Sequence, residues 1–350
     1  MIRTHFECEA TWRAHQGSTH ALAVTPEGRV VSAGGQPQNR ALKLWDRTSG
    51  CLFTTDTDVL YGRDVLCVAC LPGNRVICGI ADGTLVVFNL EDGEPLQQLQ
   101  AHEWEDEDNI IYGVAVLPPR LGDGVVSACG DGTLRFWDLS TGRCTKTQDR
   151  NGVRDSVGVI CVVVIPDGNV VSVALDGTLK SCNIITGGEI RTFNESGGEI
   201  ECLAVLSDGC VVSGGRDGHL KVWDLTRSSE EACVKDIVAN DYEITYLTTL
   251  SDSRVVFCVF TLWSSALKFW DVAAGRCLQE LRFENTGRIN SVAALPDGRI
   301  IFGFTNWDEP TGGVVKVYFD FQRATEKKLA ASVARQRACG DVAELVAKFI

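Results

Sequence analysis

The sequence predicts an all-β protein: a seven-bladed β-propeller that is closed by its N-terminal strand and followed by a short α-helical C-terminal extension. Three observations lead to this prediction. A segment made of a turn, a valine-rich strand, a second turn and a strand ending in an aromatic residue recurs seven times. The copies follow one another about every 45 residues, the period of propeller blades with four short strands each. The chain also begins with a strand that no earlier segment can pair with.

The most regular part of the repeat is the strand that ends in the aromatic residue. Four copies close it with Trp-Asp, and the others carry Phe, Cys or Tyr in place of Trp, at Trp45, Phe88, Trp137, Cys182, Trp223, Trp270 and Tyr318. Four copies place an Asp-Gly pair, which favours a tight hairpin, before this strand: Asp82-Gly83, Asp131-Gly132, Asp176-Gly177 and Asp217-Gly218. Each copy therefore contains a hairpin of two strands.

The second copy shows the order of strands within one blade. Its four strands are expected at Val65–Leu71, Arg75–Cys78, Leu85–Asn89 and Leu96–Gln100. Short strands separated by turn residues at this spacing are typical of an all-β repeat protein. The strands of a blade are counted here from the axis outward.

The two ends of the chain complete the expected domain organisation. The seventh copy stops after its third strand at Phe319, while His5–Trp12 alternates between apolar and polar residues as an isolated strand. Placed as the fourth strand of blade 7, this segment closes the ring and removes its open edges. We therefore assign residues 1–321 to the propeller.

Residues 322–350 are predicted to form a helical extension. Asp341 and Glu344 have the spacing of a capping box, and an apolar stripe at helical spacing follows them to Ile350. The segment Gly340–Val346 is similar to the second helix of an ankyrin repeat, so the extension is interpreted either as a helix packed on the propeller or as a truncated ankyrin-like unit.

Charge and composition restrict the classes of partner. The formal net charge of −13 argues against nucleic acid as the main partner and against an anionic membrane surface, because both are bound through clustered Lys and Arg. No run approaches the ~20 apolar residues that span a bilayer. The 15 cysteines, without a secretory signal, indicate reduced thiols in a cytoplasmic protein, with a nuclear location also compatible. Cys67 and Cys70 have metal-like spacing, but residues three apart on a strand face opposite ways.

The seven copies resemble the WD-repeat family over about residues 5–320. The resemblance implies a propeller that is closed by its N-terminal strand. It also implies a hydrogen-bonded network of a His, a Ser or Thr, the turn Asp and the strand Trp within a blade. In the third blade this network is expected to comprise His102, Ser127, Asp131 and Trp137. Blade 1 keeps His15, Ser32 and Trp45 without the turn Asp, and blade 5 keeps Ser213, Asp217 and Trp223 without the His.

No catalytic constellation emerges from the sequence. The Ser, His and Asp of the network match a catalytic triad in composition only, because the set recurs blade by blade and lacks an oxyanion feature. The acidic run Glu103–Asp108 lacks the spaced ligands of a calcium loop and is interpreted as a solvated loop. We therefore predict a protein that is not an enzyme and needs no cofactor and no metal.

The function predicted is that of a scaffold or adaptor that binds partner proteins on the top face of the propeller. The chain is expected to be monomeric or part of a larger complex. The alternative is the substrate-receptor subunit of a ubiquitin ligase, although no F-box-like region and no Trp-Asp followed one residue on by Arg supports it.

The predicted contact surface lies on blades 6, 7 and 1, where Asp-Gly turns are replaced by longer loops. Trp263, Trp307 and Arg40 belong to these loops, and Trp104 lies in the acidic loop entering blade 3. Tryptophan is favoured at interfaces because its rigid ring buries much area at little entropic cost. The other interpretation is that Trp263 and Trp307 only pack their own loops.

Overall fold

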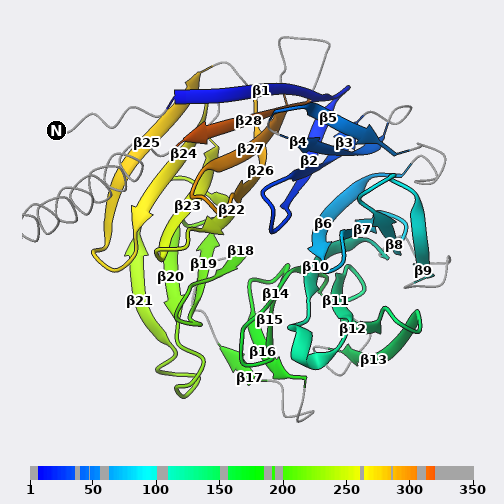
Figure 1. Cartoon of the computed structure of the whole chain (residues 1–350). Helices are drawn as coiled ribbons and strands as arrows, with labels where there is room; N and C mark the ends of the chain where they lie inside the picture. Colours follow the sequence, from blue (N-terminus) through cyan, green and yellow to red (C-terminus); the bar gives the residue numbers. More distant parts are fainter. Residues whose placement is uncertain are drawn as a thin grey trace, which may run out of the picture.

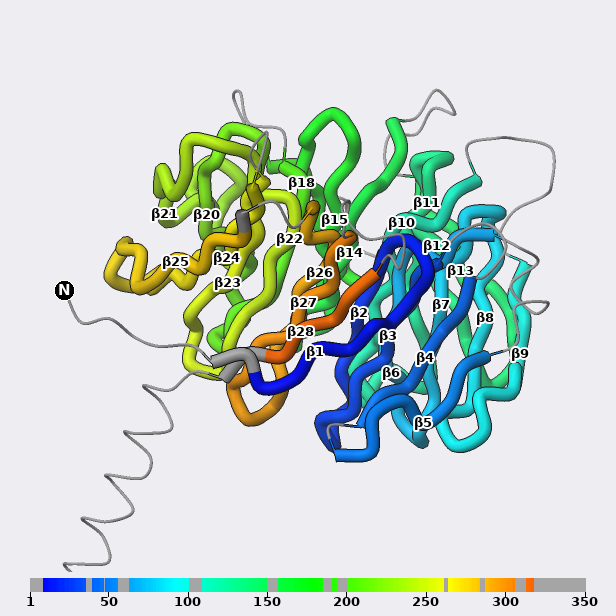
Figure 2. The backbone as a smooth tube through the Cα atoms, turned by 90° about the horizontal axis from the view of Figure 1, so that it is seen from above, coloured from blue at the N-terminus to red at the C-terminus, as the bar shows by residue number. Residues whose placement is uncertain are grey.

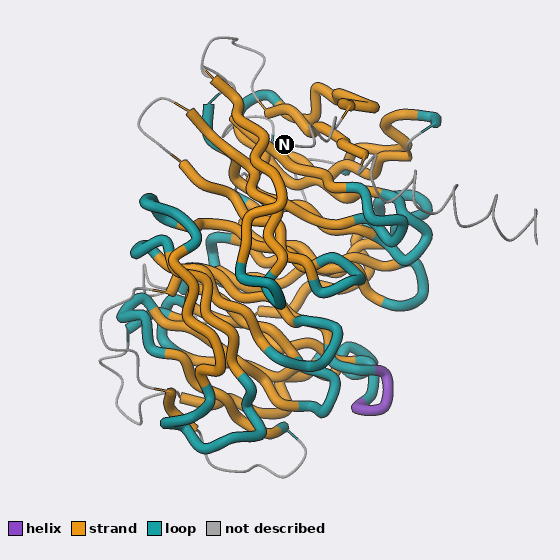
Figure 3. The backbone as a smooth tube through the Cα atoms, turned by 90° about the vertical axis from the view of Figure 1, so that its left-hand side faces the viewer, coloured by secondary structure: helices purple, strands orange, loops and turns teal. Residues whose placement is uncertain are grey.

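The computed structural model describes residues 7–35, 40–46, 48–55, 63–100, 109–149, 157–184, 191–193, 200–260, 264–284, 287–305 and 313–319. These residues form seven antiparallel sheets of four strands each, placed around a central axis (Figure 1). The predicted fold class is thereby confirmed. The strands run between the two faces of the ring, and a short 3-10 helix lies on one of these faces (Figure 3).

The first three blades follow chain order from the axis outward. Blade 1 comprises β2 (Ser18–Val24), β3 (Val30–Gly35), β4 (Ala41–Asp46) and β5 (Gly50–Thr54). Blade 2 comprises β6 (Val65–Leu71), β7 (Arg75–Ile80), β8 (Thr84–Asn89) and β9 (Pro95–Gln100). Blade 3 comprises β10 (Ile111–Val116), β11 (Gly124–Cys129), β12 (Thr133–Asp138) and β13 (Arg143–Asp149).

The other four blades have the same order. Blade 4 comprises β14 (Val159–Val164), β15 (Asn169–Ala174), β16 (Leu179–Asn183) and β17 (Arg191–Phe193). Blade 5 comprises β18 (Ile200–Val205), β19 (Val211–Gly215), β20 (His219–Trp223) and β21 (Cys233–Val238). Blade 6 comprises β22 (Ile244–Thr249), β23 (Arg254–Phe260), β24 (Ser264–Asp271) and β25 (Arg276–Glu284). Blade 7 comprises β26 (Ile289–Ala294), β27 (Ile300–Thr305), β28 (Gly313–Phe319) and β1 (Glu7–His15).

Each blade is apolar on both faces because it is packed between two neighbours. The second strands are therefore valine-rich and buried along their whole length, as in β3 and β11. The described apolar side chains form one cluster between each pair of adjacent blades, and the cluster between blades 7 and 1 joins Val315 and Val317 to Leu22 and Trp45. The core is thus a ring of similar interfaces rather than a single centre.

The N-terminal strand closes the ring as predicted. β1 is antiparallel to β28, with Trp12 opposite Val315, and Figure 2 shows the two strands side by side. The strand extends to His15, beyond the predicted end at Trp12. The indole ring of Trp12 stacks on that of Trp45 in blade 1, with centroids 5.3 Å apart and planes within 6°. β1 therefore holds blade 7 and blade 1 together.

An ion pair of a buried arginine fastens the same strand. Arg299 is only 7% exposed, and its Nη1 donates to Glu9 Oε2 of β1 over 2.9 Å. Its Nε donates to Asp297 Oδ2 over 2.7 Å, which orients the guanidinium. Charge-assisted bonds of this kind are stronger than neutral ones when they are sheltered from water.

Three local features depart from the regular blade. In blade 6, where a longer loop is expected from the sequence, β23 and β24 extend until Phe260 pairs with Ser265. β17 is short in the described residues. In blade 3, Pro119 starts a 3-10 helix, Pro119–Leu121, because proline is preset for a first helical position. The predicted helical extension, 322–350, lies outside the described residues.

Replacing Arg299 with Gln should destabilise the closed ring. Glu9 would lose its charge-assisted bond at a half-buried position, so the free energy of unfolding should fall by about 1–3 kcal/mol. Arg282→Gln is the matched control, because Arg282 is highly exposed and its pair with Glu280 should contribute little. Urea denaturation followed by circular dichroism measures both. Equal stability of the two variants would contradict a role for Arg299 in closure.

Candidate interaction surface

The first strand of every blade carries a β-bulge at the same place near its start. The register shifts there by one residue against the second strand, and a bulge changes the direction of the side chain that it carries. The bulged residues are His20, Leu66, Tyr112, Ile160, Glu201, Thr245 and Asn290. They lie at the end of the ring where second strands connect to third strands, which we call the upper face.

A cleft of about 330 Å³ opens among these residues at the mouth of the central channel. Six of the seven bulged residues line it, together with Leu175, Tyr246 and Arg288. Because each blade contributes one side chain at the same height, the chemistry of the mouth changes from blade to blade while its backbone stays constant. We call this site the mouth cleft.

One half of the mouth cleft is apolar. Leu66, Tyr112 and Ile160 come from the consecutive blades 2, 3 and 4, and Leu175 is added by the hairpin turn of blade 4. Tyr112 is 37% exposed and Leu175 is 54% exposed. The backbone N–H of Leu175 donates to Gly158 O over 2.9 Å, which fixes the turn that carries it. Large apolar side chains that are exposed to solvent at a concave surface are typical of binding sites.

The other half of the mouth cleft is polar. Glu201 forms an ion pair with Arg216, which occupies in the blade 5 turn the position that Leu175 has in blade 4. Arg288 lies beside them with a longer contact, 3.8 Å from its Nη2 to Glu243 Oε1. Thr245 and Tyr246 of β22 complete this side. The cleft therefore joins an apolar wall to a polar wall.

Arg40, a predicted contact residue, lies close to the mouth cleft but is engaged within the protein. Its Nε is 2.6 Å from Asp64 Oδ1, and its side chain is only 15% exposed. Asp64 also approaches His20 Nε2 at 4.0 Å. Burial lowers the pKa of His20, with Asp64 acting against this shift, so the imidazole is neutral at pH 7. A contact of Arg40 with a partner stays a prediction, as do those of Trp104, Trp263 and Trp307, which lie outside the described residues.

Three of the four residues of the expected blade 3 network, Ser127, Asp131 and Trp137, are described, and they lie within that blade. Trp137 Nε1 donates to Ser127 Oγ over 3.0 Å, and both side chains are buried. Asp131 accepts from the backbone N–H of Thr133 over 2.9 Å and from its hydroxyl over 2.7 Å, as expected of a turn residue. His102 lies outside the described residues, so the complete network of four stays a prediction.

Blade 1 has a related network in a buried position. Trp45 Nε1 donates to Ser32 Oγ over 2.8 Å, and His15 Nε2 is 2.9 Å from the same oxygen. Burial, with Lys43 nearby, lowers the pKa of His15 from 6.5 to about 3. The imidazole is therefore neutral and structural at physiological pH.

Blade 6 replaces this hydrogen bond with aromatic packing. Phe257 stands where blades 1, 3 and 5 have serine, and its ring centroid is 6.2 Å from that of Trp270, at a tilt of 47°. Trp270 Nε1 is buried without a hydrogen-bond partner in the described part of the chain. The aromatic position is thus retained for packing, while its polar atom is uncompensated.

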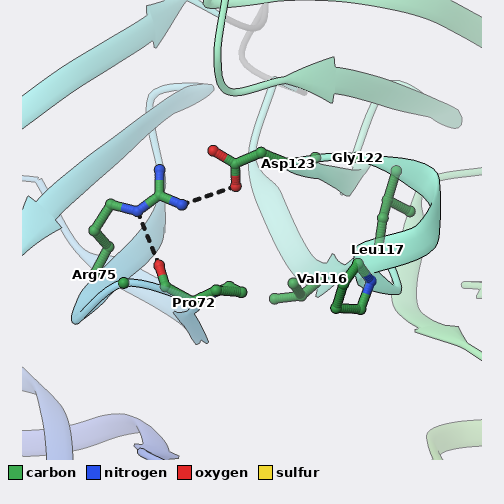
Figure 4. Close-up of a pocket in the computed structure, with 9 residues that line it drawn as sticks. Pro72, Arg75, Val116, Leu117, Gly122 and Asp123 are labelled. Carbon is green, nitrogen blue, oxygen red and sulfur yellow. Dashed lines mark hydrogen bonds and ion pairs between the residues drawn. The ribbon is translucent and has the colours of Figure 1, made fainter.

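A second cleft, of about 380 Å³, lies on the opposite, lower face between blades 2 and 3. Pro72 and Arg75 form one wall, and the segment from Val116 to Asp123 forms the other (Figure 4). Arg75 donates to Pro72 O over 3.0 Å and to Asp123 Oδ1 over 2.8 Å. Because its two charges neutralise each other, this cleft offers less for recognition than the mouth cleft does.

The cysteine pair with metal-like spacing does not converge. Cys67 Sγ contacts Ile111 O at 3.7 Å between blades 2 and 3, while Cys70 lines the lower mouth of the channel. Burial raises the pKa of each thiol to about 12. In the described part of the chain, no group of three or more His, Cys, Asp or Glu side chains has the arrangement of a metal site.

Comparison with known proteins agrees with this geometry. The sequence model of the family "WD domain, G-beta repeat" matches residues 6–46, 93–138 and 187–224. Each range covers the outer strand of one blade and the first three strands of the next, which is blade 1, 3 or 5. In these three blades Trp donates to Ser. Together with the ring of seven four-stranded blades, these three matches bear out the resemblance to the WD-repeat family.

The chain is similar to several proteins over part of their length. It is 30% identical to autophagy-related protein 16 of Arabidopsis thaliana over 51% of this chain and 33% of that protein. Small ribosomal subunit protein RACK1y of Oryza sativa subsp. japonica is 28% identical over 39% of each chain. Telomerase protein component 1 of Rattus norvegicus is 22% identical over 65% of this chain and 8% of that protein. The aligned region thus spans less than half of each relative.

Sequence reasoning missed the ring of bulged residues. An alignment of the seven first strands would have placed them at one position, but their shared direction arises from bulges that the sequence does not mark.

No helix among the described residues has the length and apolarity to cross a membrane.

The buried state of His15 predicts a pH dependence of stability. The unfolded chain takes up a proton near pH 6.5, whereas the folded chain stays neutral until about pH 3. The contribution of the neutral His15 to the free energy of unfolding is therefore fully present well above pH 6.5 and is lost as the pH falls toward 3. At pH 5 the loss should be about 2 kcal/mol. Denaturant unfolding of wild type and His15→Gln at pH 7.5 and pH 5 measures this. An equal loss in both proteins would show that His15 does not titrate on unfolding.

The different surroundings of Trp137 and Trp270 predict different costs of losing the indole N–H. Trp137→Phe leaves Ser127 buried without its donor, whereas Trp270→Phe removes an N–H that has no described acceptor. Both changes remove similar volume, so Trp137→Phe should lower the free energy of unfolding by about 1 kcal/mol more. Trp223→Phe, which also breaks a bond to serine, should behave like Trp137→Phe. Equal losses at all three positions would show that packing alone matters.

Proposed function

We propose that this propeller is a non-catalytic scaffold that binds partner proteins on its upper face. The observation that carries the proposal is the mouth cleft, where apolar and charged side chains from consecutive blades are held by a regular backbone. A rigid surface of this kind binds without a large loss of conformational freedom. Arg40, Trp263, Trp307 and Trp104 are proposed to extend the contact toward the rim.

The state of the polar groups supports binding rather than catalysis. Glu201 and Asp64 are each engaged by an arginine, and His20 is neutral with a lowered pKa. The hydroxyl of Thr245 has no hydrogen-bond partner among the described residues, so no acid or base activates it there. These contacts orient side chains at a surface.

The names of the relatives are compatible with roles in larger assemblies. One is a small ribosomal subunit protein, and another is nuclear distribution protein nudF 1 of Talaromyces marneffei, which is 30% identical over 41% of this chain. A substrate receptor of a ubiquitin ligase remains the alternative form of the same scaffold role. No observation on the described residues favours it over an adaptor.

Affinity purification with surface variants tests the proposed face. Tyr112→Ala combined with Leu175→Ser should abolish the capture of partners that the wild type retains, since each buried anchor contributes about 2 kcal/mol of affinity. Leu52→Ser combined with Leu96→Ser is the control, because these side chains are equally exposed on outer strands. Melting temperatures verify that both variants are folded. If the control variant lost its partners while the upper-face variant kept them, the binding surface would lie at the rim of the propeller and not on the upper face.

A further inference from the structure

We propose that the mouth cleft recognises a peptide segment in which an acidic side chain stands next to a large apolar one. This inference rests on the proposed function and specifies the partner that the upper face takes. It follows from the charges that line the cleft, from the way one arginine is held there, and from the position of the apolar wall.

The charges of the mouth cleft are unequally compensated. Of the described residues that line it, only Glu201 and Arg288 carry a full charge at neutral pH, since the His20 imidazole is neutral. Glu201 is neutralised by its close ion pair with Arg216. Arg288 has Glu243 as its described carboxylate contact, at 3.8 Å, beyond the length of a good hydrogen bond. The cleft therefore offers a cation whose donors are available.

Arg288 is also held in place for a ligand. Its guanidinium carbon lies 5.6 Å from the centroid of the Phe260 ring, so the planar group stacks on an aromatic face. Its backbone O accepts from the N–H of Thr305 over 3.0 Å, which fixes the start of blade 7. Its Nε is buried without a hydrogen-bond partner among the described residues. A guanidinium that is positioned by stacking and whose side chain is 44% exposed is suited to a carboxylate.

A second polar group points to the same ligand chemistry. Thr245 Oγ1 is buried at the cleft and has no hydrogen-bond partner in the described part of the chain. A hydroxyl can donate to a carboxylate oxygen, and leaving it unmatched in a buried position is unfavourable. A ligand carboxylate between Arg288 and Thr245 would satisfy both groups.

The apolar wall selects the neighbouring residue of the ligand. Leu66, Tyr112, Ile160 and Leu175 lie on blades 2 to 4, across the mouth from Arg288 at the start of blade 7. Successive side chains of an extended peptide point to opposite sides. An extended segment crossing the mouth would therefore direct its acidic side chain to Arg288 and the next, apolar side chain to the wall. A basic side chain would instead meet Arg288 and be repelled.

A peptide array tests the specificity with the full-length chain. The probes are hexapeptides Gly-Ser-X-Z-Ser-Gly, in both orders of X and Z over all twenty residues, and the strongest binder is measured by fluorescence anisotropy. We expect enrichment of Asp or Glu beside Leu, Ile, Met or Phe. Changing the acidic residue to its amide, or the apolar residue to Ala, should weaken binding about tenfold. Enrichment of Lys or Arg in place of the acidic residue would overturn the proposal.

Protein variants separate the two walls. Arg288→Gln should weaken binding of the acidic peptide about tenfold and binding of its amide form less than twofold. Arg288→Lys should retain part of the preference for the acidic peptide. Arg282→Gln, on the exposed face of β25, should leave binding unchanged. Leu175→Ser should weaken every peptide with an apolar residue, with Leu96→Ser as its control. An unchanged preference for acidic peptides in a folded Arg288→Gln chain would overturn the assignment of Arg288.

The peptide array tests this inference and the affinity purification tests the proposed function, so the two can be contradicted separately. If partners are still lost when Tyr112 and Leu175 are replaced but no acidic-apolar preference is found, the upper face binds proteins by other chemistry and only this inference falls. If partners are retained in that variant, the proposed function itself fails.

Discussion

The pairing of β1 with β28 is the contact on which the whole ring depends. Every other blade is built from consecutive strands, but blade 7 obtains its fourth strand from the opposite end of the chain. Trp12 stacks on Trp45, and Glu9 accepts from Arg299, so the same strand joins two blades through aromatic packing and through a buried charge. Because each apolar cluster lies between adjacent blades, opening this one junction would expose two blade faces at once.

A closed ring explains why the upper face can present varied chemistry. The bulges recur at one place in all seven first strands, so the backbone determines where each mouth residue lies. The side chain is then free to differ: Ile160 and Glu201 occupy equivalent positions in neighbouring blades. Folding constrains the backbone at these positions, and recognition selects the side chains.

The blades and their closure could be predicted because their signals are local and repeated. The aromatic position, the Asp-Gly turns and the alternation of the first strand each follow from a few neighbouring residues. The mouth cleft could not be predicted, because it depends on contacts between blades. Arg40 was assigned to a binding loop, yet its pairing with Asp64 joins residues 24 positions apart on adjacent blades.

Departures from the repeat carry different meanings depending on where they occur. The family pattern is best kept in blades 1, 3 and 5, where Trp and Ser are joined, and these blades alternate with divergent ones. Blade 6 shows that a buried Phe can replace the serine, because the aromatic residue is needed mainly to fill the space between blades. This departure in the core therefore keeps the space between the blades filled, although it gives up the hydrogen bond. Departures at the upper face, such as Leu175 where the next blade has Arg216, do not change the fold, so their chemistry is available for binding a partner.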